Sequence, residues 1–137
     1  MNIDAYLDRE QFEAAARERL AAAAEHLATH GWHQGDMYDA RDLHYDGTPQ
    51  NGTGARWTKT ARSCALGAIQ ASGERDYLLE TGATNLLRKH LGLSAIPVLD
   101  SAGYQMTYKD PVAAWNDDPS RTAEDVILAM KRAAVES

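Results

Sequence analysis

Residues 8–31 carry a full set of local signals for one long amphipathic helix. Asp8 is a suitable N-cap, Gln11 stands at the third helical position, and Gly31 supplies a C-terminal stop. Between them, apolar residues recur every three or four positions: Phe12, Ala16, Leu20, Ala23 and Leu27. This is the spacing of a single helix face. We predict a helix that buries this face against other elements.

The composition of the whole chain indicates that the elements packed against this helix are helices as well. The sequence holds 24 alanines and 13 leucines, but only four valines and four isoleucines. Alanine and leucine are strong helix formers, whereas β-branched residues favour strands. A chain of 137 residues fits one domain with its own core. We therefore predict a mainly α fold, with residues 1–137 forming a single compact helical domain of four to five helices.

Capping signals place the other helices. One is expected from about residue 62 to 72, and residues 74–91 form either one helix interrupted at Gly82 or two short helices. Asp110-Pro111 opens a short helix, because proline is well suited to the first helical position. The last helix has Thr122 as its cap, with Asp125 at the third position. Residues 93–109 are expected to be loop with one short strand.

The segment 36–60 breaks the helical pattern. Its centre, DGTPQNGTG at 46–54, is rich in turn residues, so its arms pair as a small β-hairpin or the segment is an irregular loop. We expect 46–54 to be dispensable for folding. Asp42, His44, Asp46 and Gly47 copy the opening of a calcium-binding EF-hand loop, but Thr53 stands where a glutamate ligand is needed. A solvated acidic loop is the better interpretation.

Charge and composition exclude some classes of function. A formal net charge of −6 argues against a nucleic-acid partner, which requires a basic face. The N-terminal residues show no secretion signal and no apolar run has the length of a membrane span, so we expect a cytoplasmic protein without membrane contact. A single cysteine excludes an internal disulfide and fits a reducing compartment. No cofactor motif is present, and we expect none.

His26, His30 and His33 stand at helical spacing, which raises the question of a metal site. In metal-binding H-E-x-x-H helices the two histidines lie one turn apart. Here the glutamate of that motif is missing, and Gly31 ends the helix before His33. Histidines in a last turn also interact favourably with the helix dipole. We therefore predict no metal site.

Cys64 is the sharpest chemical candidate. It stands at the start of the second predicted helix beside Arg62, a position that lowers a thiol pKa. An enzyme would combine Cys64 with His33 as base and Asn116 or Asp117 as orienting group. However, alanines flank Cys64, and a free cysteine in such a setting behaves as a small hydrophobe. We predict a buried, slowly reacting thiol.

Three tryptophans and one arginine are the candidate binding residues. Trp32 and Trp115 are expected to belong to the core, and Trp57 is the candidate for an exposed side chain. Arg121 is expected to pair with Asp117, which lies in a turn after the short helix at 111–115. Asn116 and Asp117 are expected to bond to nearby backbone and to be structural before they are functional.

Three stretches together resemble a family of small uncharacterised proteins of actinobacteria and their phages. They are GWHQG at 31–35, CALGAI at 64–69 and AWNDDPSRTAEDV at 114–126. The matching positions are Trp32, Gly35, Cys64, Gly67, Ala68, Trp115, Asn116, Asp117, Arg121 and Thr122. The family has no assigned activity. It often carries cysteine at the position of His33, so an enzyme that uses His33 would not be general to it.

These observations lead to one functional prediction and two alternatives. We predict a non-enzymatic cytoplasmic accessory protein, of an actinobacterium or a phage, that binds another macromolecule, with a protein as partner. The first alternative is a cysteine-dependent hydrolase or transferase using Cys64, His33 and Asn116 or Asp117. The second is cation binding by the acidic loop. We also expect the three stretches to meet in space, with Gly35 and Gly67 allowing close approach of the backbone.

Overall fold

The computed structural model describes residues 8–43, 58–94, 96–99, 101–103 and 105–135. Its elements, in chain order, are α1 (Arg9–His30), a 3-10 helix (Ala40–Asp42), α2 (Ala65–Ala71), α3 (Tyr77–Leu91), β1 (Ile96–Leu99), β2 (Gln105–Lys109), α4 (Pro111–Asn116) and α5 (Ala123–Val135). The predicted mainly α fold is confirmed. None of the helices in these ranges combines the length and the apolar run that a bilayer crossing requires.

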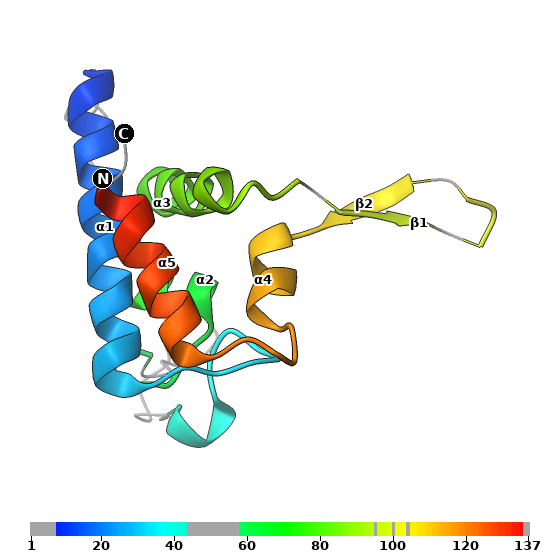
Figure 1. The fold of residues 1–137 in the computed structure, drawn as a ribbon, viewed down its shortest axis with the longest axis horizontal. Helices are drawn as coiled ribbons and strands as arrows, with labels where there is room; N and C mark the ends of the chain where they lie inside the picture. The colour runs from blue at the N-terminus through cyan, green and yellow to red at the C-terminus, as the bar shows by residue number, and fades with distance from the viewer. Residues whose placement is uncertain (1–7, 44–57, 95, 100, 104, 136–137) are drawn as a thin grey trace, which may run out of the picture.

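Helix α1 runs along one side of the helical body, and α2, α3 and α5 all pack against it (Figure 1). Asp8 caps its start by accepting a hydrogen bond from the N–H of Glu10 at 2.8 Å. The helix ends at Gly31, which has φ of 106° and donates to the carbonyl of Leu27. The expected face is buried, with Leu20 and Ala23 fully covered. The sequence prediction for this helix is confirmed.

Small side chains let the helices approach closely. Alanines from α1, α2, α3 and α5 belong to one buried cluster together with larger residues, namely Leu20, Ile69, Leu87, Val126 and Met130. Helix α3 is continuous through Gly82, so both predicted interruptions of this segment are wrong. A Cβ atom at Gly82 would lie 2.9 Å from two ring atoms of Phe12 on α1. This glycine therefore serves helix contact and not helix termination.

The described strands both lie within residues 93–109, where one short strand was expected, and not in the described part of 36–60. β1 and β2 pair as an antiparallel hairpin, with Ile96 opposite Lys109 and Val98 opposite Thr107. In the described part of 36–60, residues 36–43 and 58–60 contain a 3-10 helix and one isolated bridge, from Tyr38 to Ser63. Residues 44–57, the centre of the predicted hairpin, lie outside the described ranges. Pro97 lies in β1 opposite Tyr108, and a proline is tolerated there because each strand of a two-stranded ribbon is an edge strand.

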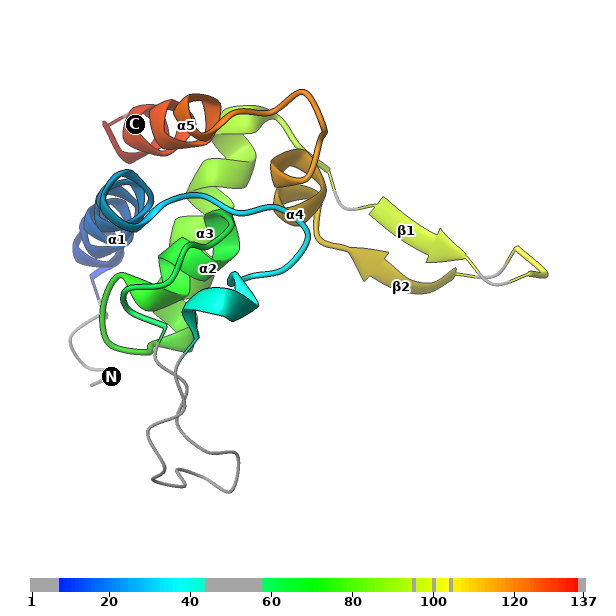
Figure 2. The ribbon, with the colours of Figure 1, turned by 90° about the horizontal axis from the view of Figure 1, so that it is seen from below.

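The hairpin, which we call the arm (residues 96–109), projects from the helical body (Figures 1 and 2). None of the described helices packs extensively against it. The arm leaves the body after α3 and returns to it at α4. Asp110 caps α4 through a hydrogen bond from the N–H of Val112 at 2.8 Å. Thr122 and Asp125 form the expected reciprocal cap at the start of α5, with distances of 3.0 and 3.2 Å.

Candidate functional site

The three stretches singled out in the sequence meet at one place, which we call the junction (residues 31–38, 63–67 and 115–118). The N–H of Ser63 donates to the carbonyl of Gly31, and the N–H of His33 donates to the carbonyl of Ser63. The N–H of Cys64 donates to the carbonyl of Met37 at 2.9 Å. The expectation that these segments lie together is confirmed.

Asn116 stands at the centre of the junction and is completely buried. Its carbonyl oxygen Oδ1 accepts hydrogen bonds from Trp32 Nε1 at 2.7 Å and from the N–H of Ala65 at 3.0 Å. Its Nδ2 donates to the carbonyl of His33 at 3.1 Å and to Asp117 Oδ1 at 3.0 Å. A side-chain amide has two donors and two main acceptor sites. All of them are used, so Asn116 ties α4 to α2 and to the end of α1.

Two glycines give the junction its shape by different means. A Cβ atom at Gly67 would collide with the carbonyl oxygen of Met37, so only glycine permits this approach of α2 to the loop. Gly35 has φ of 98°, a left-handed conformation that favours glycine. Its N–H donates to Asp117 Oδ1 at 3.0 Å. The expected close approach therefore holds at Gly67, whereas Gly35 is required by its backbone conformation.

The pairing predicted for Arg121 is wrong. Its Nε donates to the carbonyl of Trp115 at 3.0 Å, and its guanidinium lies 4.3 Å from the centroid of the Trp115 ring. Its carboxylate neighbour is Asp118, at 4.0 Å. Asp117 is turned instead toward Gly35, so Arg121 reaches the next carboxylate. The ring contact is a cation–π arrangement.

Cys64 is the N-cap of α2 and is 5% exposed. Its Sγ accepts a hydrogen bond from the N–H of Gly67 at 3.4 Å. Burial raises the pKa of the thiol, and this outweighs the lowering by the backbone N–H of Gly67. A thiol with a raised pKa is a poor nucleophile at neutral pH because little thiolate forms. The predicted burial of Cys64 is confirmed.

The side-chain contact that the structure shows for His33 is with Asp39. Its Nδ1 lies 3.8 Å from Oδ2 of Asp39, a buried carboxylate. Asp39 also accepts hydrogen bonds from Arg41 at 2.6 and 3.0 Å, and these hold the pKa of its carboxyl well below the ordinary range. The junction thus brings Asn116 close to the Cys64 helix, but His33 belongs to a separate ionic cluster.

The sequence did not predict the ionic cluster, which consists of His33, Asp39, Arg41, Asp42 and Arg62. Arg62 donates to both carboxylate oxygens of Asp42, at 2.6 and 2.9 Å, and lies 3.5 Å from Asp39. The guanidinium lowers the pKa of Asp42 to about 2. The interpretation of Asp42 as the first residue of a calcium loop is therefore not supported by its surroundings. His44, Asp46 and Gly47 lie outside the described residues.

The structure describes two of the three tryptophans that were predicted as binding residues. Trp32 and Trp115 are partly buried and pack against the hydrophobic core, as expected. Trp57, the candidate for exposure, lies outside the described residues. Arg121 is partly buried as well, and its guanidinium lies over the ring of Trp115.

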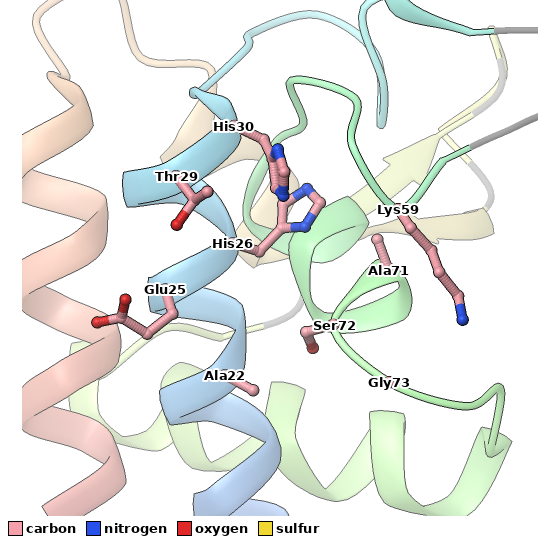
Figure 3. Close-up of a pocket in the computed structure, with 9 residues that line it drawn as sticks. All are labelled: Ala22, Glu25, His26, Thr29, His30, Lys59, Ala71, Ser72 and Gly73. Atoms are coloured by element: carbon pink, nitrogen blue, oxygen red, sulfur yellow. The ribbon is translucent and has the colours of Figure 1, made fainter.

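A shallow groove of about 350 Å³ lies between the end of α1 and the end of α2 (Figure 3). His26 and His30 of α1 line one side, and Ala71 and Ser72 at the end of α2 line another. The predicted three-histidine pattern is thus divided, because His33 faces the ionic cluster instead. In the described ranges, no group of three or more histidine, cysteine or acidic side chains is arranged to hold a metal ion.

Comparison with known proteins gives one match. No curated protein matches the chain, and no solved structure matches it. The model of a family of unknown function (DUF6197) matches residues 12–136, a range that contains the whole junction, the groove and the arm. Because this match covers nearly the entire chain, the protein belongs to that family of unknown function.

Proposed function

We propose that this protein acts by binding another protein, and that the arm makes the contact. The observation that carries the proposal is the arm itself, a two-stranded hairpin that stands away from the helices (Figure 2). A two-stranded hairpin is marginally stable in water without packing against other elements. A chain that maintains one outside its body gains from it only where something else covers it.

The chemistry of the arm favours a protein as partner. Each strand of a two-stranded hairpin has an outer edge with unpaired backbone N–H and C=O groups. An extended peptide or a sheet edge can pair with such an edge, which is the usual basis of strand addition. Leu99 in β1 is 56% exposed and offers an apolar contact beside that edge. The net charge of −6 argues against a nucleic acid in the same role.

The junction supports this role because it fixes the base of the arm. Asp110, the cap of α4, directly follows the arm, and α4 ends at Asn116 in the centre of the junction. Helix α3, which precedes the arm, packs against α1 and α5. Both ends of the arm are thus attached to well-packed helices, so a partner would meet an arm of fixed direction. Rigid presentation reduces the entropy lost on binding.

The resemblance of the three motifs supports a more specific form of the proposal. In that form the protein is a cytoplasmic accessory protein of an actinobacterium or one of its phages. The alternative, a cysteine-dependent hydrolase or transferase, gains no support from the geometry. Cys64 is buried and the pKa of its thiol is raised. The side-chain amide of Asn116 forms all its hydrogen bonds with Trp32, Ala65, His33 and Asp117.

A matched pair of substitutions tests the proposal. Leu99→Lys changes an exposed leucine of the arm, and Leu128→Lys changes a leucine of α5 that is 47% exposed. Proteins bound to each purified variant from a lysate of the source organism would be quantified by mass spectrometry, and a candidate partner would then be titrated in purified form. We expect Leu99→Lys to lose the partner and Leu128→Lys to keep it.

A second variant, with residues 96–109 replaced by a short Gly-Ser linker, tests the independence of the arm. Because none of the described helices packs extensively on the arm, the linker variant should keep its helical circular dichroism and its melting temperature within a few degrees. Unfolding of this variant would show that the arm is part of the core. Loss of the partner in Leu128→Lys alone would move the binding surface to α5. Either result would contradict the proposal.

A further inference from the structure

His26 and His30 lie one helical turn apart in the last two turns of α1, and both rings face the groove (Figure 3). Their ring centroids are 4.9 Å apart, with an angle of 52° between the ring planes. Two imidazoles that each bind one metal ion at about 2.0–2.1 Å have centroids roughly 5 Å apart when the bonds meet near the tetrahedral angle. The observed centroid distance of 4.9 Å is therefore compatible with two ligands of one ion.

The surroundings of His26 fix which of its nitrogens is available. Its Nε2 lies 2.9 Å from the carbonyl oxygen of Ala61, and a carbonyl can only accept a hydrogen bond. In the neutral ring Nε2 therefore carries the proton, and Nδ1 carries a lone pair. Metal-binding histidines usually have this arrangement, in which the other ring nitrogen donates to a carbonyl or carboxylate and so orients the ring.

The electrostatics of the groove favour a cation near the two rings. The groove lies at the C-terminal end of α1, which ends at His30, and at that of α2, which ends at Ala71. The C-terminal end of a helix carries a partial negative charge. Two other charged side chains line the groove, Glu25 and Lys59. In Figure 3 both extend away from the two rings, Glu25 to one side and Lys59 to the other.

We propose that His26 and His30 form a two-histidine site for a divalent transition-metal ion that prefers imidazole, such as Zn²⁺, Ni²⁺ or Cu²⁺. The groove volume of about 350 Å³ has room for water to complete the coordination sphere, since each water molecule occupies roughly 30 Å³. A site with two protein ligands leaves positions open for solvent or an external ligand. It therefore binds an exchangeable ion and is not a structural metal site. This inference does not depend on the function proposed for the arm.

Titration of the untagged protein with Ni²⁺ and with Zn²⁺, followed by calorimetry, tests the proposal. His30→Ala removes one ligand from a half-buried position and should fold normally. His26→Gln removes the other ligand but keeps an amide that can donate to the carbonyl of Ala61. We expect each substitution to weaken binding at least tenfold, a loss in the range found even for outer-shell changes at metal sites. His90→Ala on α3, outside the groove, is the matched control and should bind like the unchanged protein.

A spectroscopic measurement locates the ion independently of affinity. Ni²⁺ is paramagnetic, so its binding should broaden the amide NMR signals of residues near the end of α1, near Ala61 and near Ser72. The broadening should disappear on addition of a chelator and below about pH 5.5, where histidine ligands are protonated. Binding weaker than about 1 mM would overturn the proposal. Equal affinity in His30→Ala and the unchanged protein, or broadening centred elsewhere, would overturn it as well.

Discussion

Replacing Asn116 by alanine is the most direct test of how the junction holds the fold together. The substitution removes the acceptor of the Ala65 N–H and of the Trp32 indole N–H. It also removes the donor to the His33 carbonyl and to Asp117. Ala65 is fully buried, so water cannot replace the acceptor that its N–H loses. Trp32 is only partly buried, so water can partly replace the acceptor that its indole N–H loses.

The expected loss of stability follows from these contacts. A buried donor left without an acceptor costs about 1–3 kcal/mol, and a truncated buried side chain adds a cavity term of similar size. Asn116→Ala should therefore destabilise the protein by about 3–4 kcal/mol. Domains of this kind have a total stability of about 5–15 kcal/mol, so the variant would unfold well below the temperature of the parent.

Urea denaturation followed by far-ultraviolet circular dichroism measures this loss as a lower midpoint with an unchanged slope. Asn85→Ala on α3 is the matched control because Asn85 is exposed, and it should change stability by no more than about 0.5 kcal/mol. Asn116→Asp separates hydrogen bonding from cavity formation. It keeps the acceptor but turns an oxygen toward the His33 carbonyl and Asp117, so it should regain stability as the pH falls and the new carboxyl becomes a donor. A loss below about 1 kcal/mol in Asn116→Ala would refute the central role of Asn116.

Three further measurements test the junction, and a fourth tests His26 in the groove. The thiol of Cys64 should react slowly with a thiol reagent in the folded protein and fast after unfolding, because burial raises its pKa; faster labelling of the folded protein would contradict this. Asp117→Ala should cost about 0.5–2 kcal/mol in urea denaturation, as for a lost cap, because Gly35 loses its acceptor; an unchanged midpoint would contradict it. Ser63→Ala should leave stability unchanged or raise it by up to about 1 kcal/mol, since this buried hydroxyl finds no partner among the described residues; a clear loss would reveal a partner. The pKa of His26 is lowered from 6.5, so the unfolded chain binds more protons and stability should fall as the pH drops below about 6.5; His26→Gln should remove this part of the pH dependence, and an unchanged slope would contradict the assignment.

The sequence was sufficient to predict features that depend on residues close together in the chain, such as the starts of helices. The start of α1 follows from Asp8, and the start of α5 follows from the spacing of Thr122 and Asp125. Both features depend on side chains within a few residues of the backbone groups they satisfy. The meeting of the three junction stretches was also predicted, because the order of the motifs and the small size of Gly67 indicated close packing.

Long-range features could not be predicted in this way. The sequence places Arg19 on a helix where an arginine would ordinarily be solvent-exposed, yet it is only 7% exposed. Its guanidinium donates to the carbonyls of Ile69, Gln70 and Glu74 at 2.7 to 3.0 Å. These residues lie 50 to 55 positions further along the chain. Nothing near residue 19 indicates these acceptors. One short strand was expected in 93–109, but the second strand and the pairing of the two were missed, because neither segment shows a clear alternation of apolar and polar residues.

The short helix α2 shows why Cys64 looked like a catalytic residue and is better explained as a structural one. A helix of seven residues is too short to be stable alone, because its unpaired end groups outnumber its internal hydrogen bonds. At its start, Asn116 and Cys64 accept hydrogen bonds from the N–H groups of Ala65 and Gly67. At its end, Arg19 donates to the carbonyls of Ile69 and Gln70. Gly73 belongs to the same arrangement, since a Cβ atom there would lie 2.8 Å from Nη1 of Arg19. The helix exists because side chains from α1 and α4 hold both of its ends. The position of the thiol at a helix start therefore follows from this packing and requires no catalytic role.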